Sequence, residues 1–376
     1  DSVFVARLSQ DAMNAVSLAF PLQTLCIAFA VGTGVGMNAL LARSLGEKNM
    51  QAVDRAAGTG LFLTLCTAAV FAVLGFSLAT PFFRFQTENA QIIAYGRDYV
   101  MICIGGSLGL FLQIYGERLL QSTGRTDLSM ISQIAGAVCN IVLDPILIFG
   151  LLGFPRMEVA GAAIATSLSQ IICAWLVIHT LRRANGDYHL EFQKIRPDAW
   201  LLKRMLVIGL PAGISSMLYN ITNVYVQKAI NMLGTDTVAA WSVFWKLDGI
   251  FWPINNAIGI AVMTYVGQNF GAGDRERVHE SIHKGLLIHL TTSALFSVII
   301  FSGRYPMMHL FVGDDPTVIA IGAGAMTVSH ANDSYFWVVT NFGQMTPEQG
   351  YKTQTMLTLV LGLSSMVGIF ILSLIL

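Results

Sequence analysis

Charged side chains are scarce in this sequence. Only 12% of its 376 residues are Asp, Glu, Lys or Arg, whereas 54% are hydrophobic; soluble domains average about 25% charged residues. The 22 basic and 22 acidic residues balance, so no excess positive charge favours nucleic acid as a partner. This composition predicts an all-α integral membrane protein with several spans, surrounded by the lipid bilayer.

Cysteine motifs for metal binding or redox chemistry are also missing. No CxxC or Cys/His spacing occurs, so we interpret the cysteines as small buried hydrophobic residues. No metal site, cofactor or obligate protein partner is predicted. All five cysteines lie in apolar runs: Cys26, Cys66, Cys103, Cys139 and Cys173.

Nine apolar runs are long enough to cross a bilayer, which takes roughly 17–25 helical residues. They are 15–42, 57–80, 91–121, 128–152, 158–181, 205–232, 237–268, 284–301 and 354–376. Fourteen Lys and Arg residues fall in the connections on one side, and five fall at the opposite ends. The positive-inside rule then places the first set of connections in the cytoplasm and predicts a multi-pass protein. The connections predicted to be cytoplasmic are 43–55, 118–125, 182–204 and 275–284.

The sequence repeats itself at a shift of 225 residues. Ser9–Leu22 lies over Gly234–Leu247, and Gly60–Phe76 lies over Gly285–Phe301 without a gap. Both halves therefore run in the same sense, which favours two parallel-repeat bundles of six helices each. We predict a first bundle over 1–181, a cytoplasmic linker over 182–204 and a partial second bundle over 205–322.

Both ends of the chain depart from this repeat. The sequence has no initiator methionine or signal peptide and opens on Asp1, which aligns with Val226 late in a helix. We therefore expect a first helix truncated at its N-terminus. The similarity stops at Gly322, so we expect the second bundle to lack its last three helices. Residues 323–376 are predicted to be a foreign tail with one clear transmembrane helix, at 354–376.

The run CNIVLDPILIFG places an amide and a carboxylate four residues apart in an apolar span. Asn140 and Asp144 would share one helix face, and Pro145 would free the carbonyl of Ile141. An intramembrane carboxylate costs roughly 2.5–3.5 kcal/mol and usually has a function. We interpret the pair as a proton or cation site, with a structural polar pair as the alternative. Asp1 could share this cavity, or could be a solvated terminus.

Several other residues allow two interpretations. Thr166 could offer a hydroxyl ligand, although the small residues around it are also typical of close helix packing. Gln113 and Glu117 share a face, where an interfacial ion pair of Glu117 with Arg118 is favoured. Gly32 and Gly36 are interpreted as a contact of small residues between helices. A second polar cluster could form in the second half, from Lys246, Asp248 and Asn223.

Residues 1 to about 322 resemble the multidrug and toxic compound extrusion (MATE) family. The resemblance is carried by GVGMNALLARSLGEKN, ERLLQSTGRTDLSM, CNIVLDPILIFG and VAGAAIATSLSQ. It implies a secondary active antiporter, in which proton or sodium enters as an organic, often cationic, drug or toxic compound leaves. It also implies that the coupling ion binds Asp144, Asn140, Asp1 and Thr166.

The tail resembles a different family, the gluconate permeases (GntP), from about Ile319 onwards, with a junction within about 317–325. This leaves alternatives to the exporter. One is a gluconate-type proton symporter, supported by the tail alone. A second is a truncated or chimeric fragment without transport activity. A third is an integral-membrane enzyme, for which the sequence shows no catalytic cluster, so we predict no enzymatic activity.

Overall fold

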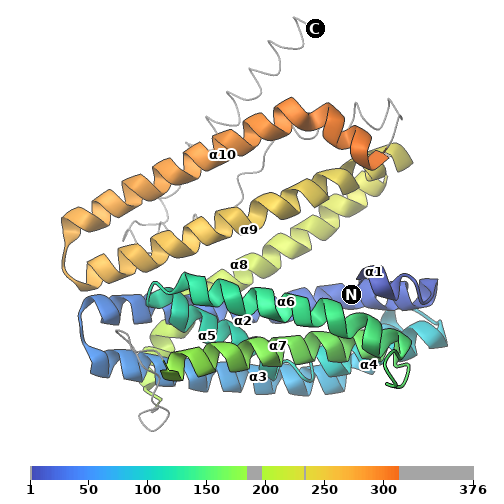
Figure 1. The fold of residues 1–376 in the computed structure, drawn as a ribbon, viewed down its shortest axis with the longest axis horizontal. Helices are drawn as coiled ribbons and strands as arrows, with labels where there is room; N and C mark the ends of the chain where they lie inside the picture. The colour runs from blue at the N-terminus through green and yellow to red at the C-terminus, as the bar shows by residue number, and fades with distance from the viewer. Residues whose placement is uncertain (1, 184–196, 233, 313–376) are drawn as a thin grey trace, which may run out of the picture. The chain divides into compact units, whose positions relative to one another are not determined.

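The computed structural model describes residues 2–183, 197–232 and 234–312, and every element in these ranges is a helix (Figure 1). The elements are α1 Ser2–Val5, α2 Gln10–Gly46, α3 Met50–Gln86, α4 Ala90–Cys103, α5 Leu108–Ser122, α6 Thr126–Phe149, α7 Glu158–Arg183, α8 Ala199–Asn231, α9 Thr235–Gly271 and α10 Arg275–Val312. Within the described ranges, eight helical stretches are long and apolar enough to span a membrane. They match the first eight predicted runs, and the ninth run, 354–376, lies outside the described residues.

Short polar side chains cap the N-termini of several of these helices. The Ser9 hydroxyl accepts a hydrogen bond from the backbone N–H of Ala12 at 3.0 Å, and the Asn49 side chain caps α3 at Ala52 with 3.1 Å. Asp198 caps α8 by accepting from the N–H of Trp200 at 2.9 Å. Such caps satisfy backbone donors that have no partner within the helix. The Asp198 cap explains why α8 begins at Ala199, ahead of the predicted run.

The predicted run 91–121 is divided into α4 and α5 by a short turn at residues 104–107. Gly105 and Gly106 in this turn have low helix propensity. The turn also packs closely on α3, because a Cβ on Gly75 would lie 2.5 Å from the backbone nitrogen of Gly105. Hydropathy alone did not reveal the break, since the run is apolar throughout.

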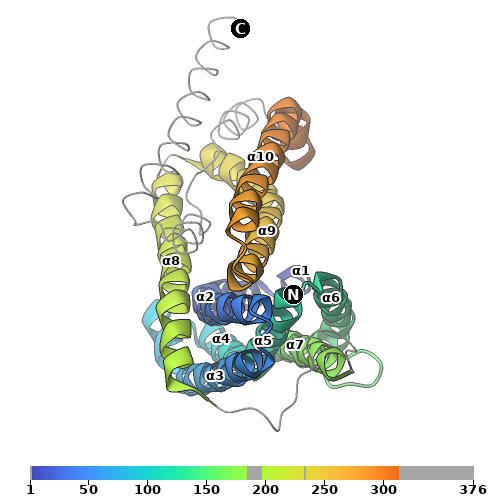
Figure 2. The same ribbon diagram turned by 90° about the vertical axis from the view of Figure 1, so that its left-hand side faces the viewer.

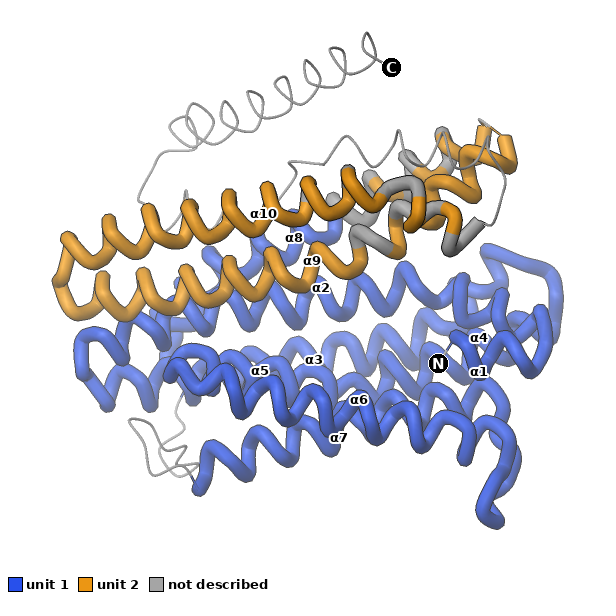
Figure 3. Tube along the Cα trace, turned by 45° about the horizontal axis from the view of Figure 1, so that its top comes forward, with its two compact units in different colours: residues 1–220 blue, residues 221–376 orange. Residues whose placement is uncertain are grey.

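The chain divides into two compact units, residues 1–220 and 221–376, with the boundary inside α8 (Figure 3). In the first unit α2 to α7 run roughly parallel in one bundle (Figure 2). Aromatic side chains fill its core, in which Phe71 lies 5.5 Å from Phe29 and 5.7 Å from Phe111 between ring centroids. In the second unit α9 and α10 form an antiparallel pair, joined by a turn in which Gly273 has φ of 75°. The predicted division into bundles and linker stays a prediction.

Glycines bring α2 and the first part of α8 into backbone contact within the first unit. A Cβ on Gly32 would lie 2.7 Å from the carbonyl oxygen of Gly209, and one on Gly36 would collide with the carbonyl oxygen of Met205. Gly32 and Gly36 therefore form the small-residue helix contact that their spacing predicts. We call this contact, formed by Gly32, Gly36, Met205, Gly209 and Gly213, the glycine contact.

The burial of the cysteines is predicted correctly except at one position. Cys26, Cys103 and Cys173 are buried and Cys139 is half-buried, but Cys66 is exposed. Cys66 lies on the outer face of α3, among exposed apolar side chains such as Phe62 and Val70. The expectation for Cys66 is wrong because an apolar residue in a membrane protein can face outwards as well as inwards.

Candidate functional site

The helix α6 has a polar face and an apolar face. The buried residues Ser129, Ser132 and Gly136 lie three or four residues apart, half-buried Asn140 follows four residues later, and buried Asp144 follows after another four. The opposite face carries exposed apolar side chains: Met130, Ile134, Val138 and Ile141. Because residues three and four apart lie together on a helix, the polar face of α6 is turned into the first unit.

Asp144 is completely buried on this face, with 0% of its surface exposed. Asn140 Nδ2 lies 3.5 Å from Asp144 Oδ1 and 3.5 Å from Thr166 Oγ1 on α7. Both distances are long for hydrogen bonds, so the amide joins the three side chains loosely. The structure thus brings together three of the four residues predicted for the site.

The fourth predicted residue, Asp1, lies outside the described residues. The segment that follows it, α1, packs against α6 and α7. The first described residues, Ser2–Val5, therefore lie beside the two helices that carry Asn140, Asp144 and Thr166. A role for Asp1 stays a prediction.

Small residues allow α6 and α7 to approach closely at this point. A Cβ on Gly161 of α7 would lie 2.6 Å from the carbonyl of Leu147, and one on Gly136 of α6 would collide with Cys173 Sγ. The two interpretations of the region around Thr166 are therefore compatible. Its small neighbours pack the helices together, and the close packing places the Thr166 hydroxyl beside Asn140.

Tyr99 on α4 belongs to the same region but was not predicted. Its side chain is 2% exposed, and its hydroxyl accepts a hydrogen bond from Gln23 Nε2 at 3.2 Å. It packs in one core cluster with Ile148 of α6 and Ala163 of α7. A tyrosine in an apolar span carries no sequence signal that separates a site residue from core. Its partner Gln23 is 76 residues away, so only the tertiary fold reveals the contact.

Glu117 and Arg118 on α5 are both buried, at 7% and 6% exposure. Glu117 Oε1 accepts a hydrogen bond from Gln113 Nε2 at 2.9 Å, and Arg118 Nη1 donates to Gln121 Oε1 at 2.7 Å. In the described part of the chain the two do not form the ion pair that we expected. Adjacent residues on a helix point in different directions, and here each side chain bonds an amide on its own face.

The second predicted polar cluster is only partly described. Asn223 on α8 is half-buried and Lys246 on α9 is exposed, while the side chain of Asp248 lies outside what the structure describes. The cluster stays a prediction.

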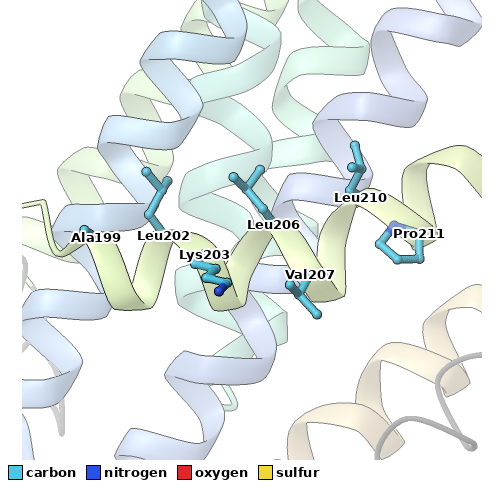
Figure 4. Close-up of a pocket in the computed structure, with 7 residues that line it drawn as sticks. All are labelled: Ala199, Leu202, Lys203, Leu206, Val207, Leu210 and Pro211. Carbon is cyan, nitrogen blue, oxygen red and sulfur yellow. The ribbon is translucent and has the colours of Figure 1, made fainter.

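A shallow depression of about 520 Å³ lies along α8 (Figure 4). Seven residues of this one helix line it: Ala199, Leu202, Lys203, Leu206, Val207, Leu210 and Pro211. Lys203 is its one charged residue, and the depression contains none of the predicted site residues. We interpret it as the open apolar face of a membrane helix.

The Asp144 region can hold a small, hard cation or a proton. It offers a carboxylate, an amide and a hydroxyl, and oxygen ligands of this kind suit hard cations. Within the described ranges, no three His, Cys, Asp or Glu side chains are grouped so as to hold a metal ion. A carboxylate, an amide and a hydroxyl within a membrane span are the kinds of group that can bind a proton or a small cation.

Comparison with known proteins identifies two family similarities. The sequence model of the MatE family matches residues 1–146 and 211–330, and that of the GntP family permeases matches 286–375. The two matches overlap near the predicted junction, and most of the second lies outside the described residues.

Individual relatives agree with the first match. The probable multidrug resistance protein YoeA of Bacillus subtilis (strain 168) is 28% identical over 316 residues, 83% of this chain and 68% of that protein. A protein of Shewanella oneidensis named FAD transporter is 28% identical over 322 residues, 85% of this chain and 70% of that protein. A crystal structure of MATE in the straight conformation has a TM-score of 0.79 at 23% identity, covering 91% of this chain and 75% of that one. At this identity the structural likeness shows the fold.

Proposed function

The chain belongs to the MatE family of membrane transporters, and from this premise we propose that it is a secondary active exporter that couples the exit of an organic cation to the entry of protons or sodium ions. Its relatives named for multidrug resistance support drugs or toxic compounds as the cargo. Membership of a transporter family makes the chain a transporter and not an enzyme. Its membrane spans and its bacterial relatives support the bacterial inner membrane as its location.

One observation supports the coupling proposal above all others: Asp144 is fully buried within a membrane span, beside Asn140 and Thr166. An ionised carboxylate is costly in this environment, and binding a proton or sodium ion removes that cost. An ion that binds there therefore changes the stability of the surrounding helices. An ion gradient can drive a transport cycle only if the ion stabilises one conformation of the protein more than another.

Dye efflux from proteoliposomes tests this coupling. With a proton or sodium gradient imposed, Asp144→Asn should lower efflux about tenfold or more, because the amide cannot take up a proton or balance a cation. Asp127→Asn on the same helix is the matched control, since that carboxylate is exposed and forms only a surface ion pair at 3.6 Å. Efflux by Asp144→Asn at the parental rate would contradict a coupling role for Asp144.

The same vesicles test the substrate class. The relative named FAD transporter makes an anionic dinucleotide the natural comparison. We expect the gradient to drive export of a cationic dye in preference to FAD. Export of FAD alone would replace the cation proposal, and gluconate uptake alone would favour the tail-based alternative.

A further inference from the structure

The polar face of α6 continues beyond Asp144 to the opposite end of the helix. Cys173 Sγ on α7 lies 3.1 Å from the carbonyl oxygen of Ser132, and the Ser169 hydroxyl donates to the carbonyl of Thr166 at 2.7 Å. Polar groups thus line the contact between the two helices from Asp144 and Thr166 to Ser132 and Cys173. We call this line of contact the α6–α7 seam.

Glu117 lies at the far end of the seam. Here α5 packs against both α6 and α7, and Gly116, next to Glu117, lies against Val177 of α7, one turn beyond Cys173. The side chains of Gln133 on α6 and Cys173 on α7 lie near Glu117. Gln133 precedes Asp144 by eleven residues, which corresponds to about 16 Å along a helix. This distance is too long for direct proton transfer, so any exchange between the two carboxylates needs intermediate groups or water.

The surroundings of Glu117 contain few charges. The helices packed against α5 are α2, α3, α6 and α7. The titratable groups that act on Glu117 are Arg118 on its own helix and Cys173 on α7. Among the described residues Glu117 makes no ion pair, since Arg118 donates to Gln121 instead. Its near neighbours are the two amides of Gln113 and Gln133, which suit a carboxylate that gains and loses a proton.

Glu117 lies close to the surface of the first unit. Its own side chain is buried, but its neighbour Gln133 is exposed. The α5 helix ends at Ser122, and the connection after it is one of those predicted to be cytoplasmic. Glu117 therefore lies between the buried Asp144 region and the cytoplasmic end of the bundle.

We propose that Glu117 is a second proton-binding carboxylate, which exchanges protons with Asp144 along the α6–α7 seam and releases them towards the cytoplasm. The proposal rests on the coupling function proposed above and extends it to a path. The proton leaves the Asp144 carboxyl group, arrives on the Glu117 carboxylate and passes to water. No electron is exchanged and no other reactant is needed.

Infrared difference spectra of the purified full chain, recorded as the pH is varied, test proton binding without any need for transport. The parent should show titrating carboxylic-acid C=O bands, of which Glu117→Gln removes one and Asp144→Asn another. Glu117→Asp should restore a band at a shifted frequency, and Asp127→Asn should leave the buried bands unchanged. If the Glu117→Gln spectrum keeps every band of the parent, the proposal is overturned.

Transport in vesicles then separates a proton path from a structural role. Glu117→Gln should lower proton-driven efflux about tenfold while substrate exchange without a gradient stays within about twofold, because exchange needs no proton release. Glu117→Asp should recover part of the driven rate. If Glu117→Gln lowers driven efflux and exchange to the same extent, the proposal is overturned and Glu117 has a structural role. If the parent itself shows no driven efflux, the exporter proposal fails, and the infrared titration still decides proton binding at Glu117.

Discussion

At the scale of single residues, the Thr166 hydroxyl can be separated from the packing of the Asp144 region, because helix packing needs only the shape of the side chain. It lies 3.5 Å from the amide of Asn140, which also contacts Asp144. A valine at this position would fill the same space without offering an oxygen. The hydroxyl can therefore be tested apart from the packing of α7.

We expect Thr166→Val to weaken the apparent affinity for the coupling ion about fivefold, since a hydrogen bond contributes about 1 kcal/mol. Thr166→Ser keeps the oxygen and serves as the matched control. The measurement is the sodium or proton concentration that gives half-maximal efflux. Equal midpoints for the two variants would show that Thr166 contributes packing only.

At the scale of elements, the glycine contact between α2 and α8 depends on backbone touching backbone. At Gly36 a methyl group would meet the carbonyl of Met205, which cannot rotate away as a side chain can. By contrast, a Cβ on Gly249 of α9 would meet nothing within 4 Å. The two glycines allow the same chemical change to be compared at a packed site and an open one.

Gly36→Ala should destabilise the protein by about 1–3 kcal/mol through overpacking. Gly249→Ala should be neutral or slightly stabilising, because alanine has the higher helix propensity. Thermal unfolding in detergent, followed by circular dichroism or by a thiol-reactive dye, measures both variants. Equal midpoints would mean that α2 and α8 can separate at this contact without cost.

The same elements show how far the sequence could predict the molecule. Asn140 and Asp144 are four residues apart, so their shared face follows from helix geometry alone. The two predictions for Thr166, helix packing and a ligand role, came from its small neighbours and from the family resemblance. The contact between Tyr99 and Gln23, by contrast, depends on how α4 packs against α2. The break between α4 and α5 escaped prediction because the run is apolar throughout, and the close approach of Gly75 to Gly105 is visible only in the fold. Local periodicity therefore predicts spans and faces, and contacts between distant segments require the fold.

At the scale of the whole molecule, the eight described spans and the Lys and Arg distribution define a topology. The α5–α6 connection, residues 123–125, and the α2–α3 connection, residues 47–49, should both be cytoplasmic. The α3–α4 connection, residues 87–89, should face the opposite side. This topology places Glu117 and Asp144 in order along the path that an entering proton would take.

Thiol labelling checks this topology. In a chain with its native cysteines replaced, a membrane-impermeant reagent applied to intact cells should label Thr87→Cys, and should label Thr123→Cys only after the cells are opened. The chosen positions lie in exposed or half-buried connections, so poor accessibility is not expected to mask the result. The reverse pattern would invert the orientation and with it the proposed direction of proton release.

The exposed thiol of Cys66 can report how deeply the native α3 lies in the bilayer. It lies near the centre of the α3 span and points outwards among apolar side chains. In a bilayer, a water-soluble maleimide would be excluded from that depth, whereas an apolar one could dissolve in the acyl chains and reach it. The difference between their labelling rates would measure how deeply α3 is immersed, without any change to the sequence.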